Sequence, residues 1–118
     1  MAEAFPAELR LRKRCEFLEV QRHGKRLPSD AFVVLALARP GLPARVGITV
    51  SKKVGGAVVR NRIKRIVREA IRRNRALLPE GYEIVIVARR ESADLEYERA
   101  ATELGRALAR LGRAGRPG

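Results

Sequence analysis

The chain has 118 residues, which suits one domain, and 26 Lys and Arg against 13 Asp and Glu leave a net charge of +13 that predicts a polyanionic partner. One cysteine and one histidine exclude an intramolecular disulfide and a zinc site built from these residue types, and aromatic residues at 4% leave few platforms for stacking bases. No apolar run approaches the roughly 18 residues of a membrane-spanning helix, and charged residues replace a signal-peptide core near the N-terminus, so we expect a cytoplasmic protein with no membrane partner.

The first half of the chain is predicted to hold one helix and two strands. Apolar residues three apart precede Gly24, a typical helix stop, so a short helix is expected over about residues 14–23. Residues 31–38 form a continuous apolar run of strand length, which is typical of a strand in the middle of a sheet. Residues 45–50 resume with β-branched residues after a loop rich in Pro, and we expect the two strands to pair as an antiparallel hairpin.

The second half is predicted to hold two longer helices around a third strand. The first of these helices follows two glycines and covers about residues 58–78, before a proline. Residues 82–88 have the composition of a strand. The last helix is expected to begin at a cap formed by Asp94 or Ser92 and to continue to about Leu111, with an apolar stripe that packs against the sheet.

No internal repeat and no linker divides the chain, so residues 1–118 are expected to form a single domain. Residues 112–118 contain little that a core could bury, and we expect them to be a disordered tail behind an ordered part of about residues 9–111.

The helix expected over residues 58–78 is the most basic segment, since the stretch from Arg60 to Arg75 carries eight basic residues and one acidic residue. At about 100° per residue, one side gathers apolar residues that can pack on a sheet, namely Val59, Ile63, Ile66, Val67, Ala70 and Ile71. The opposite side carries Asn61, Arg65, Arg68 and Arg72, flanked by Lys64 and Arg75. Like charges at this spacing destabilise a free helix, and the arginine fork suits phosphate, so this side predicts docking on a nucleic-acid backbone.

A basic helix can also have roles other than nucleic-acid binding. A merely solvated helix face usually carries both signs of charge. A membrane-surface helix or a calmodulin target is also basic, but neither calls for Asn61 or for a preceding Gly-Gly loop. Gly55 and Gly56 precede the helix N-terminus, where backbone amides can hold a phosphate, although two glycines after a strand are often only a turn.

A catalytic site within the chain is not indicated. A protein nuclease needs converging carboxylates or a histidine base, and the acidic residues are scattered apart from a group around Glu91 to Glu98, where a helix dipole favours them. His23 stands beside a helix stop without a Ser/Asp or Cys partner pattern. The residues therefore predict a binding subunit and not a self-sufficient enzyme.

The stretch from Gly47 to Ala70 is similar to the signature of the bacterial ribonuclease P protein family, with Arg60-Asn61-Arg62 matching its Arg-Asn-Arg helix. The likeness covers about residues 9–110. It implies an α/β (α+β) sandwich, a small mixed sheet with helices, and a left-handed β-α-β crossover through the basic helix, against the usual right-handed preference.

The resemblance also implies a function. The family's large RNA catalyses removal of the 5′ leader of precursor tRNA with Mg²⁺, which is held mainly by that RNA, and no small-molecule substrate is expected. The protein, as a non-catalytic subunit, binds the RNA and guides the leader between the first helix and the sheet. The resemblance and the basic face together predict RNA contacts at Arg12, Lys13, Lys52, Lys53, Arg60, Asn61, Arg62, Lys64, Arg65, Arg68 and Arg72. Phe17 is the predicted leader contact, and Asn61 the candidate for a metal contact.

Two positions depart from the family pattern, because Gln21 and Leu35 stand where the family often has aromatic residues. Leader stacking is therefore expected to be weaker, and Phe17 itself can be read as a core residue. A ribosomal protein with the same kind of basic helix is the main alternative. A helix-turn-helix DNA-binding protein is a second one, but the short helix and turn of that motif do not precede the basic helix.

Overall fold

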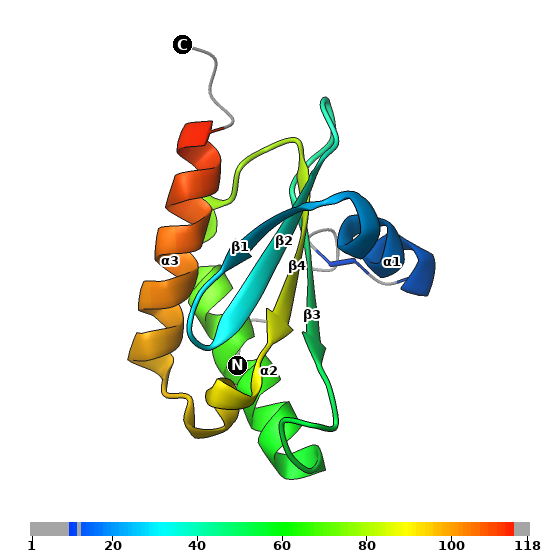
Figure 1. Ribbon diagram of the computed structural model, residues 1–118. Helices are drawn as coiled ribbons and strands as arrows, with labels where there is room; N and C mark the ends of the chain where they lie inside the picture. Colours follow the sequence, from blue (N-terminus) through cyan, green and yellow to red (C-terminus); the bar gives the residue numbers. More distant parts are fainter. Residues whose placement is uncertain (1–9, 12, 115–118) are drawn as a thin grey trace.

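The computed structural model describes residues 10, 11 and 13–114. Its elements are α1 (Arg14–His23), β1 (Lys25–Pro28), β2 (Phe32–Ala38), β3 (Arg45–Val50), α2 (Ala57–Arg73), η2 (Arg75–Leu77), β4 (Tyr82–Ala88), η3 (Arg90–Asp94) and α3 (Tyr97–Ala114). The strands form one sheet in the order β1-β2-β4-β3. β2 is antiparallel to both β1 and β4, whereas β3 is parallel to β4. The predicted mixed α+β class is confirmed (Figure 1).

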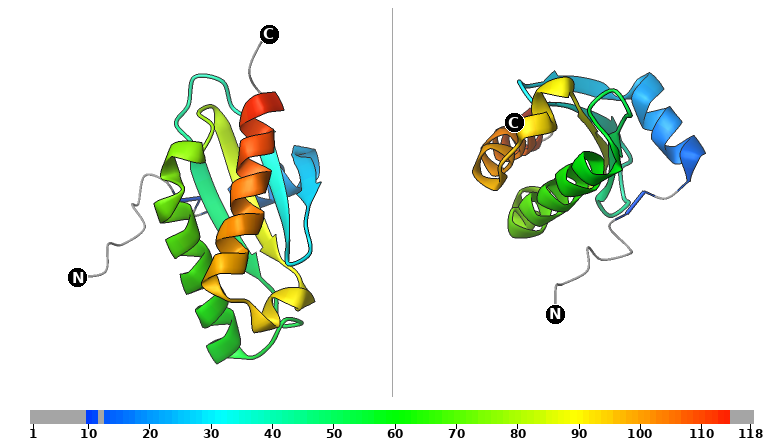
Figure 2. Two further views of the ribbon diagram at one scale, coloured as in Figure 1. Left: turned by 90° about the vertical axis from the view of Figure 1, so that its left-hand side faces the viewer. Right: turned by 90° about the horizontal axis from the view of Figure 1, so that it is seen from below.

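Helices cover both faces of this sheet. α2 and α3 lie side by side on one face, and α1 lies on the other (Figure 2). Because successive residues of a strand point to opposite faces, the sheet supplies two cores. Phe32, Val34 and Ile86 belong to the larger core with α2 and α3, while Leu35 and Val85 belong to a smaller core beneath α1.

The predicted hairpin between residues 31–38 and 45–50 is wrong. β4 lies between the two strands, so that Val34 pairs with Ile86 and Ile86 pairs with Ile48. The apolar pattern identifies strands that are buried on both faces but carries no information on which strands pair. The central position predicted for residues 31–38 is confirmed, since β2 has a partner on each side.

The helix ends also differ from the prediction. α2 stops at Arg73 and not near Leu78, because the side-chain amide of Asn74 donates to the carbonyl of Ala70 at 2.8 Å and the chain tightens into η2. α3 begins at Tyr97, so neither predicted cap lies next to it. Ser92 and Asp94 lie in η3, where the Ser92 hydroxyl donates to the carbonyl of Arg89 at 2.6 Å.

Three further points concern the ends and connections of the chain. α3 extends to Ala114, and residues 115–118 of the predicted tail lie outside the described residues. The connection from β3 through α2 to β4 is a β-α-β crossover between parallel neighbours, and its left-handedness stays a prediction. Within the described part of the chain, no helix combines the length and hydropathy needed to cross a membrane.

Candidate nucleic-acid interface

α2 has one buried side and one exposed side. Ile63, Val67, Ala70 and Ile71 are fully buried against the sheet and α3, as the apolar spacing predicted. On the opposite side Asn61, Arg65 and Arg68 are exposed, together with Arg62. The apolar side fixes the rotation of the helix, and this rotation presents the basic side chains to solvent.

The C-terminal turn of α2 differs from the rest of the basic side. The carboxylate of Glu69 accepts hydrogen bonds from Arg72 and Arg73, each with a contact of 2.7 Å. These two guanidinium groups lower the pKa of Glu69 to about 2, and Arg73 also lies over the ring of Tyr97. Arg72 is half-buried and engaged in this cluster, so it is less open to a phosphate than the exposed Arg65 and Arg68.

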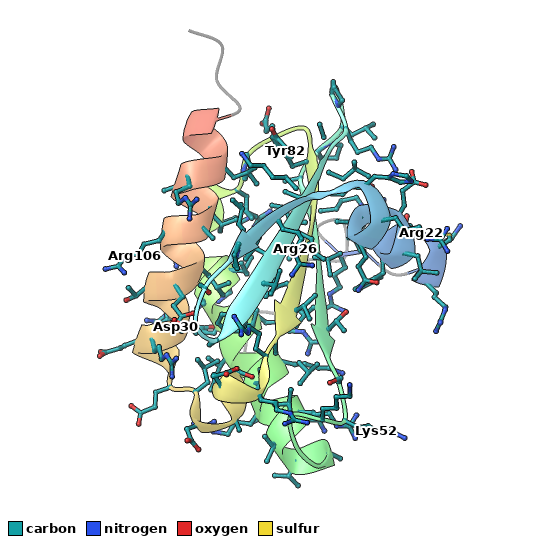
Figure 3. The ribbon with its side chains drawn as sticks, viewed as in Figure 1. Arg22, Arg26, Asp30, Lys52, Tyr82 and Arg106 are labelled. Atoms are coloured by element: carbon teal, nitrogen blue, oxygen red, sulfur yellow. The ribbon has the colours of Figure 1, made fainter. Side chains whose placement is uncertain are left out.

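The predicted contacts near the N-terminus of α2 come from the helix itself and from the loop that precedes it. Lys52 and Lys53 are exposed in the loop between β3 and α2, and Figure 3 shows Lys52 projecting into solvent. Arg60 and Lys64 are half-buried, and the Arg60 side chain donates to the carbonyl of Gly55 at 3.2 Å. The contact of Arg60 thus brings the first turn of α2 against the loop that carries Lys52 and Lys53.

Gly55 has a packing reason of its own. A Cβ atom at this position would lie 3.0 Å from the side chain of Val59. The glycine therefore lets the loop approach the first turn of α2 closely, which favours the reading of the two glycines as a turn. Lys13 is exposed just before α1, and Arg12, the remaining predicted RNA contact, lies outside the described residues.

Phe17 lies between α1 and the sheet. Its ring rests on the bare backbone of β3, because a Cβ at Gly47 would lie 2.4 Å from the Phe17 Cζ atom. Phe17 packs beside Leu11, Val20 and Leu35 and is half-buried as a residue. Phe17 therefore has a packing role, and part of its surface remains open to solvent.

Part of the sheet face beside α1 is only half covered. Val33, Thr49 and Val87 are half-buried there, and we call this surface, with Phe17 at its edge, the open sheet face. Arg26 of β1 is exposed and pairs with Leu35, which places it on the same face (Figure 3). Arg26, Leu35, Val85 and Gly47 pair in register as one row across the sheet, about 14 Å long at three strand spacings. The two middle residues of this row are buried, and Val33, Val87 and Thr49 form the open row beside it.

Sequence reasoning missed Arg26 as a candidate contact. The four residues of β1 include one buried side chain, Leu27, and this is too little alternation to predict a strand. Without β1 and its register, nothing indicated that Arg26 lies on the open sheet face. The only available signal was the basic pair Lys25 and Arg26 directly after the helix stop.

In the part of the chain that the structure describes, the acidic side chains do not gather into a metal site. Among the described residues, no three His, Cys, Asp or Glu side chains gather where they could hold a metal ion. Asn61 is exposed and offers one amide oxygen, which can join the hydration shell of a Mg²⁺ ion held by other groups but cannot hold the ion alone.

Comparisons with known proteins agree with this geometry. The model of the Ribonuclease P family matches residues 5–112. The chain is 46% identical over 112 residues to the ribonuclease P protein component of Desulfovibrio desulfuricans, covering 92% of this chain and 86% of that one. It is 43% identical over 100 residues to the component from Thermotoga maritima, covering 84% of each.

Solved structures give the same result. The ribonuclease P protein from Thermotoga maritima superposes with a TM-score of 0.78 at 36% identity, over 86% of this chain and 96% of that chain. The protein from Staphylococcus aureus superposes with a TM-score of 0.77 at 29% identity, over 87% of this chain and 94% of that chain.

Proposed function

The chain belongs to the ribonuclease P protein family, and we propose that, as the protein component of this ribonucleoprotein, it binds the catalytic RNA through the basic side of α2 and the 5′ leader of precursor tRNA on the open sheet face. The subunit is non-catalytic and works in the cytoplasm. The cleavage that removes the leader is carried out by the RNA subunit.

The observation that carries the RNA-binding part is the exposed basic side of α2. Arg62, Arg65 and Arg68 are exposed on α2, whose rotation is set by its buried side, and the exposed Lys52 and Lys53 precede this helix in the loop after β3. Each guanidinium can donate two parallel hydrogen bonds to a phosphate. If this surface neutralises roughly five to seven phosphates, the logarithm of the RNA affinity should fall linearly with the logarithm of the salt concentration. The slope should be about 0.7 to 0.9 per phosphate contact.

Leader binding is supported by the chemistry of the open sheet face. The half-buried Phe17 has an aromatic ring on which one base could stack, and Val33 and Val87 offer an apolar floor. Arg26, which is exposed on the edge strand β1, supplies a cation for a leader phosphate. Gln21 is exposed and Leu35 is buried, so at these positions the chain offers no further ring, and leader contacts should depend more on phosphate than on base identity.

Mg²⁺ belongs in this proposal as an ion of the RNA subunit. When bound, it supplies charge stabilisation at the reacting phosphate and activates the attacking water. The contribution of this chain is electrostatic, because its cations neutralise RNA phosphates and thereby reduce the amount of Mg²⁺ that the folded RNA needs. Asn61 would offer such an ion one amide oxygen, alongside ligands from other groups.

The deciding experiment is cleavage of a precursor tRNA by a bacterial ribonuclease P RNA at low Mg²⁺, with and without the chain. We expect little cleavage by the RNA alone and strong stimulation by the chain, with the mature 5′ end as product. Tight RNA binding without stimulation would contradict the proposal and favour a structural RNA-binding protein of the ribosomal kind.

A further inference from the structure

A cluster of charged residues lies beneath α1, at the end of the sheet away from the open sheet face. At its centre is Glu83 of β4, whose side chain is 8% exposed. Arg39 and Arg45 approach its two carboxylate oxygens at 3.3 and 3.4 Å. A buried carboxylate needs such partners, because an unpaired charge there would be strongly destabilising.

Both arginines continue from Glu83 to α1. Arg45 Nη2 donates to both carboxylate oxygens of Glu16, at 2.9 and 2.8 Å. Arg39 pairs with Glu19, one turn further along the helix, and this arginine lowers the pKa of the Glu19 carboxylate. Each arginine thus bridges a carboxylate fixed in the sheet and a carboxylate on α1.

Arg45 makes the more extensive set of contacts. Its guanidinium also donates to the carbonyl of Arg10, with nitrogen to oxygen distances of 3.3 and 3.4 Å. The next residue, Leu11, donates its backbone amide to the carbonyl of Val46. The side chains of Arg45 and Glu16 are 28% and 23% exposed, so water screens this pair less than a surface pair. One guanidinium therefore ties the N-terminal segment, α1 and β4 together.

The contacts of Arg45 bear directly on Phe17. Phe17 follows Glu16 in α1, and Gly47, on which its ring rests, lies two residues after Arg45 on the same face of β3. The apolar contacts beneath α1 are few, since the smaller core has Leu11, Val20, Leu35 and Val85 as its buried members. The pair between Glu16 and Arg45 is thus well placed to set the height and rotation of α1 over the sheet.

We infer that Arg45, oriented by Glu83, is a positioning residue for leader binding: it docks α1 through Glu16 and so holds the Phe17 ring at the edge of the open sheet face. The inference rests on the proposed leader site. It assigns Arg45 no contact with RNA, which separates it from the arginines of α2.

The test is a double-mutant cycle in the reconstituted holoenzyme. Affinity is measured for a precursor tRNA with a long leader and for the same precursor cut back to a single leader nucleotide, and the ratio of the two dissociation constants gives the leader contribution. Phe17→Ala and Arg45→Gln should each reduce this ratio, by about 10-fold for loss of one stacked base. Because both act through one ring, the double variant should lose no more than either single variant.

Amide hydrogen exchange of the full chain provides a readout that does not depend on the leader. In Arg45→Gln the amides of α1 should exchange about 10-fold faster, while those of α2 and α3 keep their rates. Glu16→Gln removes the charge of the same ion pair on the α1 side. It keeps a side-chain oxygen that can accept the hydrogen bond that the backbone amide of Lys13 donates to Glu16 at 3.1 Å. It serves as the second variant if Arg45→Gln folds poorly.

Arg106→Gln is the matched control, because it removes one positive charge from an exposed position of α3 that points away from the sheet (Figure 3). It should change neither the leader contribution nor the exchange of α1. Three outcomes would each overturn the positioning role of Arg45. The amides of α1 could exchange at an unchanged rate in Arg45→Gln, the leader contribution could survive in this variant but not in Phe17→Ala, or the losses of the two variants could be additive. A leader contribution that survives in Phe17→Ala would instead overturn the proposed leader site, and the inference with it.

Discussion

The carboxylate of Glu103 joins α3 to the turn between β1 and β2. It accepts hydrogen bonds from the Ser29 hydroxyl at 2.7 Å, from the amide of Ala31 at 2.9 Å and from Arg99 at 2.9 Å. Burial opposes the charge, but these donors outweigh it, so the pKa of Glu103 lies below its ordinary value. The side chain is 13% exposed, which makes it a structural carboxylate in a strongly basic chain.

Replacing this carboxylate should destabilise the fold. Glu103→Ala leaves the buried amide of Ala31 without its acceptor, and we expect the free energy of unfolding to fall by about 2 kcal/mol. The measurement is urea unfolding followed by circular dichroism. Glu98→Ala removes an exposed carboxylate from the same helix and should cost only about 0.5 kcal/mol. Equal unfolding midpoints for the two variants would contradict the role assigned to Glu103.

Glu69 provides a prediction about pH. Its pKa is lowered from an ordinary 4.5 to about 2 by Arg72 and Arg73. A lowered pKa in the folded state means that the pairs stabilise the fold above pH 4.5 and are lost as pH falls toward 2. NMR titration of the Glu69 carboxyl should show a midpoint near 2, and Arg72→Gln with Arg73→Gln should return it toward 4.5. A midpoint of 4.5 in the unsubstituted chain would show that the pairs do not form in solution.

At the scale of elements, α2 separates packing from binding, because one side is buried and the other basic. Arg65→Glu with Arg68→Glu should weaken RNA binding and lower the salt slope by about 2, while the circular dichroism spectrum stays native, since both side chains are exposed. Arg106→Glu with Arg110→Glu makes the same change of charge on exposed positions of α3 and should have a smaller effect. If the two pairs weaken binding equally, the interface is not on α2.

The elements themselves were largely predictable from local patterns, whereas their partners were not. The bounds of α1 and β4 match the prediction, because apolar spacing and helix stops act over a few residues. The exposure of Asn61, Arg65 and Arg68 followed from the same periodicity. The pairing of β3 with β4 could not be predicted in this way, because the whole of α2 separates the two strands in the sequence.

The same limit applies to the candidate site. Arg26 lies on the open sheet face only because β1 pairs with β2 in one register. Arg45 and Glu83 are 38 positions apart in sequence, and their contact exists only because β3 and β4 are neighbours. Neither the position of Arg26 nor the contact between Arg45 and Glu83 can be predicted from spacing along the chain. The resemblance to a family indicated Phe17 as a leader contact, but it did not indicate which residues hold Phe17 in place.

At the scale of the whole molecule, the dominant feature is charge density. A net charge of +13 is carried by a fold whose radius of gyration is 13.4 Å. Mutual repulsion of these cations opposes the compact state, and anions that bind the folded surface relieve it. The stability of the free chain should therefore depend on which anions are present.

We expect millimolar sulfate or phosphate to raise the melting temperature of the free chain above its value in chloride at matched ionic strength. Anions that bind the folded state stabilise it in proportion to the logarithm of their concentration once the site is filled. The general salting-out effect of sulfate on stability needs far higher concentrations. Calorimetry across a sulfate series separates the two. Arg65→Glu with Arg68→Glu should lose most of the increase if the anions bind the basic side of α2, as RNA phosphates would. Equal melting temperatures in chloride and sulfate would show instead that the ion pairs of the fold, such as those of Glu69 and Glu83, already offset the repulsion.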